Sequence, residues 1–354
     1  MMDTRKKLAI VLFNLGGPDR PEAIKPFLLN LFRDPAILRV SFFIRRLLAY
    51  WITRVRLPTT IANYALIGGK SPLLTFTRDQ ARALETALPE FDTKCIIAMR
   101  YWHPMTDAAV IEVKNFQPDD ILLLPLYPQY STTTTASSLT AWHEGAARAG
   151  LAIRTTTLCC YPDDPGYIAA ITACVHQTLQ DARSSHPGQK TWKILFSAHG
   201  LPESIIASGD PYQHQITLST QAILAALGED LDWAICYQSR VTKVKWLSPS
   251  TEDEIRHAGQ TNTGVIIVPI AFVSDHSETL VELDIEFLHI AQKSGVPAYY
   301  RVPVPNDFPP FITALANLTR DVLTRGPGLC AAIREKSCPR NHSQCPHLLA
   351  NITS

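Results

Sequence analysis

The sequence has few charged residues and almost no excess of either sign. Asp, Glu, Lys and Arg make up 18% of its 354 residues, while hydrophobic residues make up 46%. An average globular domain contains about 25% charged residues, so a composition this apolar excludes intrinsic disorder. The 33 basic and 32 acidic residues leave a net charge of +1. This balance argues against a nucleic-acid-binding protein, which is usually basic.

Long apolar runs are also missing, since none approaches the roughly 18 residues of a transmembrane helix. The basic start of the chain and the apolar residues 8–13 resemble a signal peptide, but the apolar stretch is short and no small-x-small cleavage site follows. We interpret residues 8–13 as a first strand and expect a cytoplasmic protein. The eight cysteines are then expected to be thiols or metal ligands rather than disulfides.

Three common functional motifs are missing as well. The chain has no Walker motif and no G-x-S-x-G nucleophile elbow. Gly16-Gly17 lacks the G-x-G-x-x-G spacing of a dinucleotide-binding turn. The usual signatures of nucleotide binding and of serine hydrolases therefore give no guide to the function.

Short apolar runs, by contrast, recur along the chain and alternate with helical patterns such as 74–88, 105–115, 216–227 and 277–292. The runs are β-branched or apolar at nearly every position, which is typical of parallel strands buried on both faces. Strands alternating with helices predict an α/β fold with right-handed crossovers. The six predicted strands are 8–13, 94–99, 121–126, 193–197, 233–237 and 265–270.

The two halves of the sequence resemble each other. An apolar strand precedes a glycine turn near Gly16 and again near Gly200, and Leu-Leu-Leu-Pro at 122–125 matches Ile-Ile-Val-Pro at 266–269. We therefore predict an α/β fold of two similar Rossmann-like domains, each a doubly wound parallel sheet. The expected domains are 1–164 and 165–310, followed by a C-terminal helix and Cys-rich tail, 311–354, that packs back on the first domain.

The first half is longer by a basic segment at 35–72. Residues 35–78 contain seven Lys and Arg but no Asp or Glu. One interpretation is a basic amphipathic lip that contacts a membrane surface or an anionic ligand, and the other is an ordinary helix that faces the core. The apolar residues at helical spacing are Ile37, Val40, Ile44, Leu47, Trp51 and Val55.

Two strand ends carry groups suited to metal or proton chemistry. Ligands of open α/β sheets bind beyond the carboxyl ends of the strands, and His199 follows such a strand. A neutral imidazole is a base near pH 7 and a metal ligand, although a single histidine is often purely structural. Asp275 and Glu278 have the spacing of a helix capping box. Glu282 and Glu286 continue Glu278 at four-residue intervals, which places three carboxylates on one helix face. Such a row repels itself unless it is solvated, shares protons or meets a cation.

Six long motifs make the sequence similar to the ferrochelatase family, whose members insert ferrous iron into a porphyrin to make haem. The resemblance runs from Leu12 to about Arg320. It implies two Rossmann-like domains with a porphyrin cleft between them, and a lyase that inserts Fe²⁺ into protoporphyrin IX with release of two protons, the terminal step of haem biosynthesis. The motifs are Ile67-Gly68-Gly69-Lys70-Ser71-Pro72, Met99-Arg100-Tyr101-Trp102-His103-Pro104, Pro125-Leu126-Tyr127-Pro128-Gln129-Tyr130-Ser131, Ser197-Ala198-His199-Gly200-Leu201-Pro202, Tyr237-Gln238-Ser239-Arg240 and Ser274-Asp275-His276-Ser277-Glu278-Thr279.

The resemblance also implies roles for the residues at the two strand ends. His199 and Glu278 match the pair that contacts the iron, and which of them accepts protons stays open. Glu282 and Glu286 would extend a proton or metal path from Glu278. Asp275 and His276 would orient the iron-contacting groups.

Further residues match porphyrin-binding positions of the family. Arg54 and Arg56 match a basic pair, although their spacing differs from the family pattern by one residue. Trp246 would pack against the macrocycle edge or in the core. Leu15 stands where members that use coproporphyrin tend to carry Tyr, which favours protoporphyrin IX. The full implied set is Leu15, Arg54, Arg56, Tyr64, Arg100, Tyr101 and Trp246.

Three cysteines near the C-terminus, Cys330, Cys338 and Cys345, suggest a thiolate metal site. Many ferrochelatases bind a [2Fe-2S] cluster with three such cysteines and one from the body of the chain. The internal position of the animal enzymes is Thr here, within Tyr130-Ser131-Thr132-Thr133, so the resemblance points to Cys159 or Cys160 as the fourth ligand. Zinc bound with His342 or His347, or plain free thiols, are the alternatives.

Two other functions remain open at this point. One is a chelatase for another tetrapyrrole and metal, and the other is a non-enzymatic carrier of haem or iron. We further expect peripheral contact with an anionic membrane, on the inner face of the cytoplasmic membrane, and a monomer or homodimer.

Overall fold

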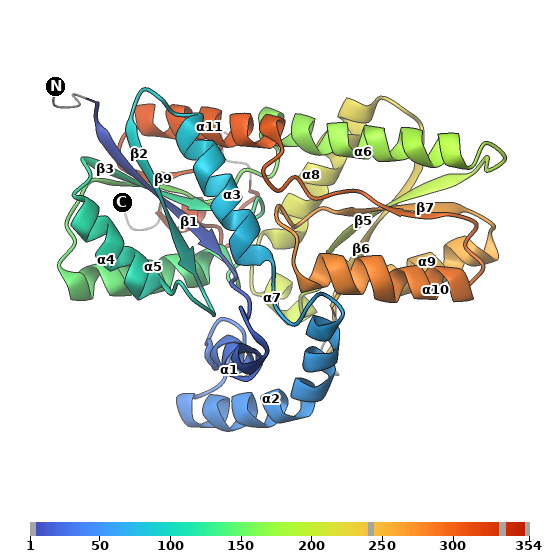
Figure 1. Cartoon of the computed structure of the whole chain (residues 1–354), viewed down its shortest axis with the longest axis horizontal. Helices are drawn as coiled ribbons and strands as arrows, with labels where there is room; N and C mark the ends of the chain where they lie inside the picture. The colour runs from blue at the N-terminus through green and yellow to red at the C-terminus, as the bar shows by residue number, and fades with distance from the viewer. Residues whose placement is uncertain (1–4, 240–243, 333–337, 351–354) are drawn as a thin grey trace. The chain divides into compact units, whose positions relative to one another are not determined.

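The computed structural model describes residues 5–239, 244–332 and 338–350. The chain divides into two compact units, shown in Figure 1. Unit 1 comprises Met1–Cys160 and Leu315–Arg334, and unit 2 comprises Tyr161–Ala314 and Glu335–Ser354. Among the described residues, no helix is both long enough and apolar enough to cross a membrane. Whether 1–164 and 165–310 fold as separate domains stays a prediction.

Unit 1 is built on a five-stranded parallel sheet with the strand order β2-β1-β3-β4-β9. The helices lie mainly in the crossovers between these strands, as expected for an α/β fold. Its elements are β1 (Lys7–Asn14), a short 3-10 helix (Pro21–Ala23), α1 (Ile24–Arg33), α2 (Phe42–Ala65), α3 (Leu73–Thr86), β2 (Asp92–Met99), α4 (Thr106–Phe116), β3 (Asp120–Pro125), α5 (Thr135–Ala149), β4 (Thr155–Leu158) and β9 (Gly328–Cys330).

The central strand β1 is apolar at consecutive positions because helices cover both of its faces. Val11 and Phe13 point to one side, where they belong to the same buried cluster as Val110 of α4 and Trp142 of α5. The alternate residues, such as Ile10, are fully buried on the other side. The uninterrupted apolar pattern is therefore the expected mark of a parallel strand buried on both faces.

The basic insertion forms α2, which packs against α1 (Figure 1). Ala49 and Thr53 are on its buried side. The predicted apolar stripe instead faces solvent, with Leu47 71% and Trp51 61% exposed. The interpretation as an ordinary core-facing stripe is therefore wrong. Helix α2 begins only at Phe42, so Ile37 and Val40 precede it. Asp34 ends α1, and its side chain accepts a hydrogen bond from the Ala36 amide in the turn that follows.

Unit 2 contains a four-stranded parallel sheet with the order β6-β5-β7-β8. This order repeats β2-β1-β3-β4 of unit 1, which confirms the predicted duplication of architecture. Helix α11 (Pro309–Thr324) contributes residues to both units. The other elements are α6 (Pro165–Ser185), β5 (Trp192–His199), α7 (Glu203–Ala207), α8 (Tyr212–Leu227), β6 (Asp232–Gln238), α9 (Thr251–Gln260), β7 (Gly264–Pro269), a π-helix (Glu278–Phe287), α10 (Leu288–Lys293), β8 (Tyr299–Arg301) and α12 (Pro346–Ala350).

Helices cover both faces of the unit 2 sheet, with α6 and α8 on one side and α9 and α10 on the other (Figure 1). On the α9 side, Leu195 and Ile267 of the sheet belong to one buried cluster with Ile255, Leu283 and Phe287. The sheet is thus a rigid base from which the loops at its carboxyl edge project.

The packing of the C-terminal helix and tail, 311–354, on the first domain stays a prediction. β9 pairs with β4 in unit 1, and the described tail residues 338–350 are grouped with unit 2. There the amide of Gln344 donates to the carbonyl of Gly209 at 3.0 Å. Gly209 has φ +97°, and a Cβ atom at this position would lie 2.3 Å from Ser343 Oγ. A glycine at 209 therefore allows the tail to approach unit 2.

Candidate active site

His199 is the last residue of β5, at the carboxyl edge of the unit 2 sheet. It lies beside Gln238, the last residue of β6, in the parallel register. The following residue has to be glycine, because a Cβ at Gly200 would lie 2.7 Å from the Gln238 carbonyl oxygen. The Tyr212 hydroxyl donates to the His199 carbonyl at 3.2 Å. These contacts fix the backbone of His199 while 39% of its side chain stays accessible.

Glu278 lies directly against this histidine. Its Oε2 is 2.8 Å from Nδ1 of His199, although the two residues are far apart in the sequence. Glu278 is the first residue of the π-helix that follows β7. The structure therefore brings together, within unit 2, the imidazole and the carboxylate that the sequence analysis selected.

The π-helix presents three carboxylates along one face. We call Glu278, Glu282 and Glu286 the acidic row. Residues four apart lie within about 40° of each other around the axis of an α-helix and of a π-helix alike, so the four-residue spacing keeps the carboxylates on one face. Glu282 is half-buried and Glu286 is exposed. The row thus leads from the half-buried His199 contact towards solvent.

Ser239 joins the first two members of the acidic row. Its hydroxyl donates to Oε2 of Glu278 at 3.2 Å and to Oε2 of Glu282 at 2.5 Å, and its amide donates to Oε1 of Glu282 at 2.8 Å. Gln238 Nε2 adds a hydrogen bond to Glu282 at 3.2 Å. Ser239 has φ +62°, a strained conformation for a residue with a side chain, which aims both donors at one carboxylate.

The carboxylates of Glu278 and Glu282 have widely different pKa values. Burial by itself raises the pKa of Glu278, but the charge and hydrogen bond of His199 outweigh it and hold the pKa at about 2. Burial and the negative charge of Glu278 raise the pKa of Glu282 to about 7. Glu278 is therefore ionised at neutral pH, whereas Glu282 exchanges its proton near neutrality. Two neighbouring acids with separated pKa values are a common mark of a proton-transferring site.

Sequence analysis missed Gln238, Ser239 and Tyr212 as site residues. The first two belong to the motif 237–240, which signalled their importance without a role, and Arg240 of that motif lies outside the described residues. Trp246 does lie next to the site, because a Cβ at Gly200 would be 3.5 Å from its ring.

Asp275 and His276 lie just before the start of the π-helix. Asp275 accepts hydrogen bonds from Thr279, Asn306 and Arg301. His276 is buried, with Nδ1 3.1 Å from the Ser274 carbonyl oxygen, and its charge also lowers the pKa of Glu278. Both residues thus support the start of the π-helix, and any direct part in the chemistry stays a prediction.

In unit 1 the predicted Arg100 and Tyr101 share one buried partner, Asp34. Oδ2 of Asp34 lies 2.9 Å from Arg100 Nη2 and accepts hydrogen bonds from the Tyr101 hydroxyl at 2.8 Å and from Ser137 at 2.5 Å. Asp34 is 4% exposed. Sequence analysis missed it, although it is the last acidic residue before the acid-free segment 35–78. Asp34 therefore anchors the base of the insertion and the end of β2 together.

The other predicted porphyrin contacts of unit 1 lie around the same core. Tyr64 and Tyr101 are buried in one cluster, and Leu15 packs against it. The turn after β1 meets the motif 67–72 there, since the Ser71 amide donates to the Pro18 carbonyl and a Cβ at Gly17 would lie 2.5 Å from Ser71. Arg54 is exposed and Arg56 half-buried on α2.

The five predicted cluster ligands are buried. The Cys159 and Cys160 sulfurs are 3.2 Å apart, and the Cys159 amide donates to the Cys330 carbonyl at 2.8 Å in unit 1. Cys338 belongs to unit 2, where Gln215 donates to its sulfur at 3.4 Å. In the part of the chain that the structure describes, no three His, Cys, Asp or Glu side chains are grouped to hold a metal.

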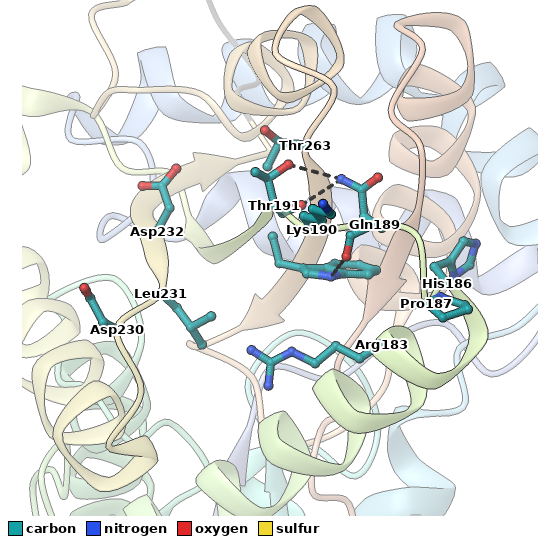
Figure 2. Close-up of a pocket in the computed structure, with 11 residues that line it drawn as sticks. Arg183, His186, Pro187, Gln189, Lys190, Thr191, Asp230, Leu231, Asp232 and Thr263 are labelled. Carbon is teal, nitrogen blue, oxygen red and sulfur yellow. Dashed lines mark hydrogen bonds between the residues drawn. The ribbon is translucent and has the colours of Figure 1, made fainter.

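A separate hollow of about 520 Å³ lies at the opposite edge of the unit 2 sheet, near the amino ends of β5 and β6. Figure 2 shows basic Arg183 and Lys190 and acidic Asp230 and Asp232 around it. These charges balance, and Arg183 and Asp232 already pair with Glu229 and Lys193. The hollow therefore has no clear preference for a charged ligand.

Comparison with known proteins agrees with this geometry. The family model described as Ferrochelatase matches residues 7–323. The chain belongs to the ferrochelatase family. Among curated relatives, ferrochelatase of Caulobacter vibrioides (strain NA1000 / CB15N) is 49% identical over 345 residues, covering 96% of this chain and 97% of the relative. Ferrochelatase of Phenylobacterium zucineum (strain HLK1) is 48% identical and covers 95% of this chain and 98% of the relative.

As a ferrochelatase the chain is a lyase of haem biosynthesis that inserts iron into protoporphyrin, with Fe²⁺ as a substrate. Solved structures support the chelatase-like fold. The sirohydrochlorin chelatase SirB from Bacillus subtilis subspecies spizizenii, in complex with cobalt, has a TM-score of 0.54 at 8% identity, with 90% of this chain and 96% of that chain covered. SirB from Bacillus subtilis with Fe³⁺ has a TM-score of 0.51 at 11% identity, with 90% and 95% covered. At such identity the likeness concerns the fold alone.

Proposed function

We propose that Fe²⁺ enters protoporphyrin IX beside the His199–Glu278 pair. The observation that carries this proposal is the 2.8 Å contact between an imidazole nitrogen and a carboxylate at the carboxyl edge of the sheet. Imidazole and carboxylate are both ligands for Fe²⁺, and a neutral imidazole also accepts a proton. Metallation exchanges two pyrrole N–H protons for one Fe²⁺, so the site needs a metal ligand and a proton acceptor close together.

The acidic row provides the route for the displaced protons. Glu278 is ionised at neutral pH and would stabilise the iron or a transient positive charge on His199. Glu282, with its pKa near 7, would receive a proton and release it again at the pH of the cell. Glu286 lies at the exposed end of the row and would hand protons to water. Ser239 would couple the first two carboxylates, because its hydroxyl contacts both.

Porphyrin recognition would use the predicted residues of unit 1 and Trp246. Arg100 is suited to a propionate because Asp34 holds it while 23% of its side chain stays accessible. Arg54 and Arg56 would provide further charge for the propionates, and Leu15 the apolar contact that favours protoporphyrin IX. Tyr64 and Tyr101 are almost fully buried, so their contribution would be to support the wall rather than to bind carboxylates.

The test is an anaerobic assay with protoporphyrin IX and Fe²⁺, in which metallation removes porphyrin fluorescence. His199→Ala and Glu278→Gln should lose metallation while porphyrin still binds and the melting temperature is kept. His257→Ala, an exposed histidine of α9, is the matched control and should react normally. Wild-type rates in either site variant would show that iron is inserted elsewhere.

We also propose that α2 docks on the inner face of the cytoplasmic membrane. Its exposed side carries large apolar residues, with Phe43 82% exposed, next to arginines and without any acidic residue. Apolar side chains flanked by arginines are typical of helices that lie in an anionic interface. A helix of this kind would collect a water-poor substrate from the bilayer.

Liposome co-sedimentation tests the membrane contact. The protein should bind vesicles of phosphatidylglycerol and phosphatidylcholine, and binding should weaken with salt because part of it is electrostatic. The double variant Phe43→Ser/Leu47→Ser should no longer bind the vesicles. Ile111→Ser, which removes an exposed apolar residue from α4, is the control. Binding that ignores both the salt and the α2 variant would contradict the proposal.

A [2Fe-2S] cluster on Cys330, Cys338, Cys345 and one of Cys159 and Cys160 remains a proposal. It is supported by the burial of all five cysteines and by the resemblance to ferrochelatases with C-terminal cysteines. Anaerobically purified protein should be reddish and contain about two irons and two acid-labile sulfides per chain. Cys345→Ser should lose both, and Cys95→Ser neither. Colourless protein after reconstitution would favour free thiols.

A further inference from the structure

The short strand β8 holds the π-helix through two alternate residues. Tyr299 and Arg301 are two positions apart, so their side chains leave the strand on the same face. The Tyr299 hydroxyl donates to the Leu283 carbonyl at 2.8 Å. The Arg301 guanidinium contacts both carboxylate oxygens of Asp284, with Nε at 2.5 Å and Nη2 at 2.9 Å. The Tyr299 contact therefore holds the backbone of the π-helix. The Arg301 contact holds one of its side chains, Asp284.

Arg301 reaches a second carboxylate as well. Its Nη1 donates to Oδ1 of Asp275 at 3.2 Å. Asp275 precedes the π-helix and also accepts hydrogen bonds from Asn306 at 2.9 Å and Thr279 at 2.8 Å. The Arg301 side chain is 14% exposed and that of Asp275 is 11% exposed. The half-buried guanidinium of Arg301 thus links β8 to both the start and the middle of the π-helix.

This arrangement addresses a weakness of the π-helix. The π-helix is rarer than the α-helix, so a stretch of ten π-helical residues has to be held by contacts from outside. Asp284 follows Glu282 by two residues, which places it on nearly the opposite side of so wide a helix. A fork that fixes Asp284 therefore fixes the direction in which Glu282 and Glu278 point, without touching either of them.

We propose that Arg301 is a positioning residue of this ferrochelatase. By clamping Asp284 and Asp275, it keeps the π-helix in the winding that turns Glu278 to His199 and Glu282 to Ser239. The expected effect on kcat rests on the proposed function of these carboxylates. The contacts of Arg301 with Asp284 and Asp275 do not depend on that proposal. The other reading is a structural ion pair that adds stability only.

The experiment compares Arg301→Lys with Arg183→Lys in the full-length protein. Lysine keeps the charge but loses the two-pronged contact with a carboxylate. Arg183 also pairs with a carboxylate of unit 2, Glu229, at a distance from the acidic row. Three quantities are measured for each variant: the melting temperature, kcat and KM for protoporphyrin IX with Fe²⁺, and amide hydrogen exchange resolved along the chain.

We expect Arg301→Lys to exchange faster within Glu278–Phe287 than the wild type, by about tenfold or more, while β5 and β6 keep their protection. Its kcat should fall by roughly ten- to a hundredfold, since a displacement of about 1 Å has that effect on a positioned group. The KM for protoporphyrin should change by less than about twofold, because Arg301 contacts no predicted porphyrin-binding residue in the described structure. Arg183→Lys should match the wild type in all three measurements.

Unchanged exchange in Glu278–Phe287 would overturn the clamp, whatever the activity. Faster exchange with an unchanged kcat would overturn the positioning role. If Arg301→Lys fails to fold, Asp284→Asn makes the same comparison, because it weakens the fork and leaves Asp275 paired with Arg301. Full activity of Glu278→Gln would refute the proposed site instead, and the exchange measurement would still report on the clamp.

Discussion

The hydroxyl of Ser239 offers a sharp test of how the acidic row works. Ser239→Ala removes the donor shared by Glu278 and Glu282 but keeps the backbone amide that donates to Glu282 at 2.8 Å. Hydrogen bonds from Ser239 favour the ionised forms of both carboxylates and so lower their pKa values. The variant should therefore raise the pKa of Glu282 above its value of about 7.

The size of the shift follows from the strength of the lost contact. A hydrogen bond to a charged group is worth about 1.5–3 kcal/mol, and one pKa unit corresponds to about 1.4 kcal/mol. Because the amide of Ser239 and the side chain of Gln238 still donate to Glu282, we expect the lower end of the range, a rise of about one unit. A proton acceptor works only when ionised, so the rate increases as pH rises through this pKa. In the plot of kcat against pH, the acid limb, where the rate rises with pH, should therefore move from about pH 7 to about pH 8.

The assay is the pH dependence of kcat for protoporphyrin IX and Fe²⁺ between pH 6 and 9, under anaerobic conditions. Ser208→Ala, which removes a hydroxyl that donates to Ile205 in the same unit, is the control and should leave the limb in place. At high pH the variant should regain most of the wild-type rate, since Glu282 is then ionised again. An acid limb that stays at the same pH in Ser239→Ala would refute the role of Glu282 as a proton acceptor.

Three further outcomes follow from the structure. Glu282→Gln should abolish the acid limb near pH 7 and lower kcat with little change in porphyrin KM, and a limb that survives would assign it to another group. Asp34→Asn should raise the KM for protoporphyrin several-fold, because Arg100 loses its buried counter-ion; kinetics with an unchanged KM would argue against Arg100 as a propionate ligand. Phe311→Ala should lower the free energy of unfolding by about 3–5 kcal/mol in urea titrations, as for other fully buried phenylalanines, and a loss below about 1 kcal/mol would mean that the core refills the cavity.

All six strands predicted from the sequence are present, including the partly exposed β2 and β6. Uninterrupted apolar runs located β1, β3, β5 and β7 because a parallel strand between two helical layers tolerates few polar side chains. β4 was missed because it begins with three threonines, and β8 because three residues carry no periodicity. Helix α2 was predicted, but the side of it that faces the core was not. Its apolar spacing was plain, but spacing alone cannot say whether a stripe faces the core or the solvent.

Prediction of the site reached the reactive side chains but not the groups that hold them. His199 and Glu278 stand out by chemistry and by their place after strands. Ser239 depends on a left-handed backbone conformation, and Arg301 on the wide winding of the π-helix. Neither conformation leaves a mark in hydrophobic periodicity, because a π-helix and an α-helix of this length share most of their apolar positions.

The late arrival of β9 has a consequence for how the protein is made. β9 pairs with β4 through Leu158 and Cys330, so the first sheet is completed by residues that follow almost all of unit 2. At a synthesis rate of about 5–20 residues per second, β4 leaves the ribosome about ten to thirty seconds before its partner strand. During that interval β4 has an open edge that can pair with other nascent chains. The order of synthesis therefore gives most of unit 2 time to fold before β9 completes the sheet of unit 1, although β1 to β4 are made first.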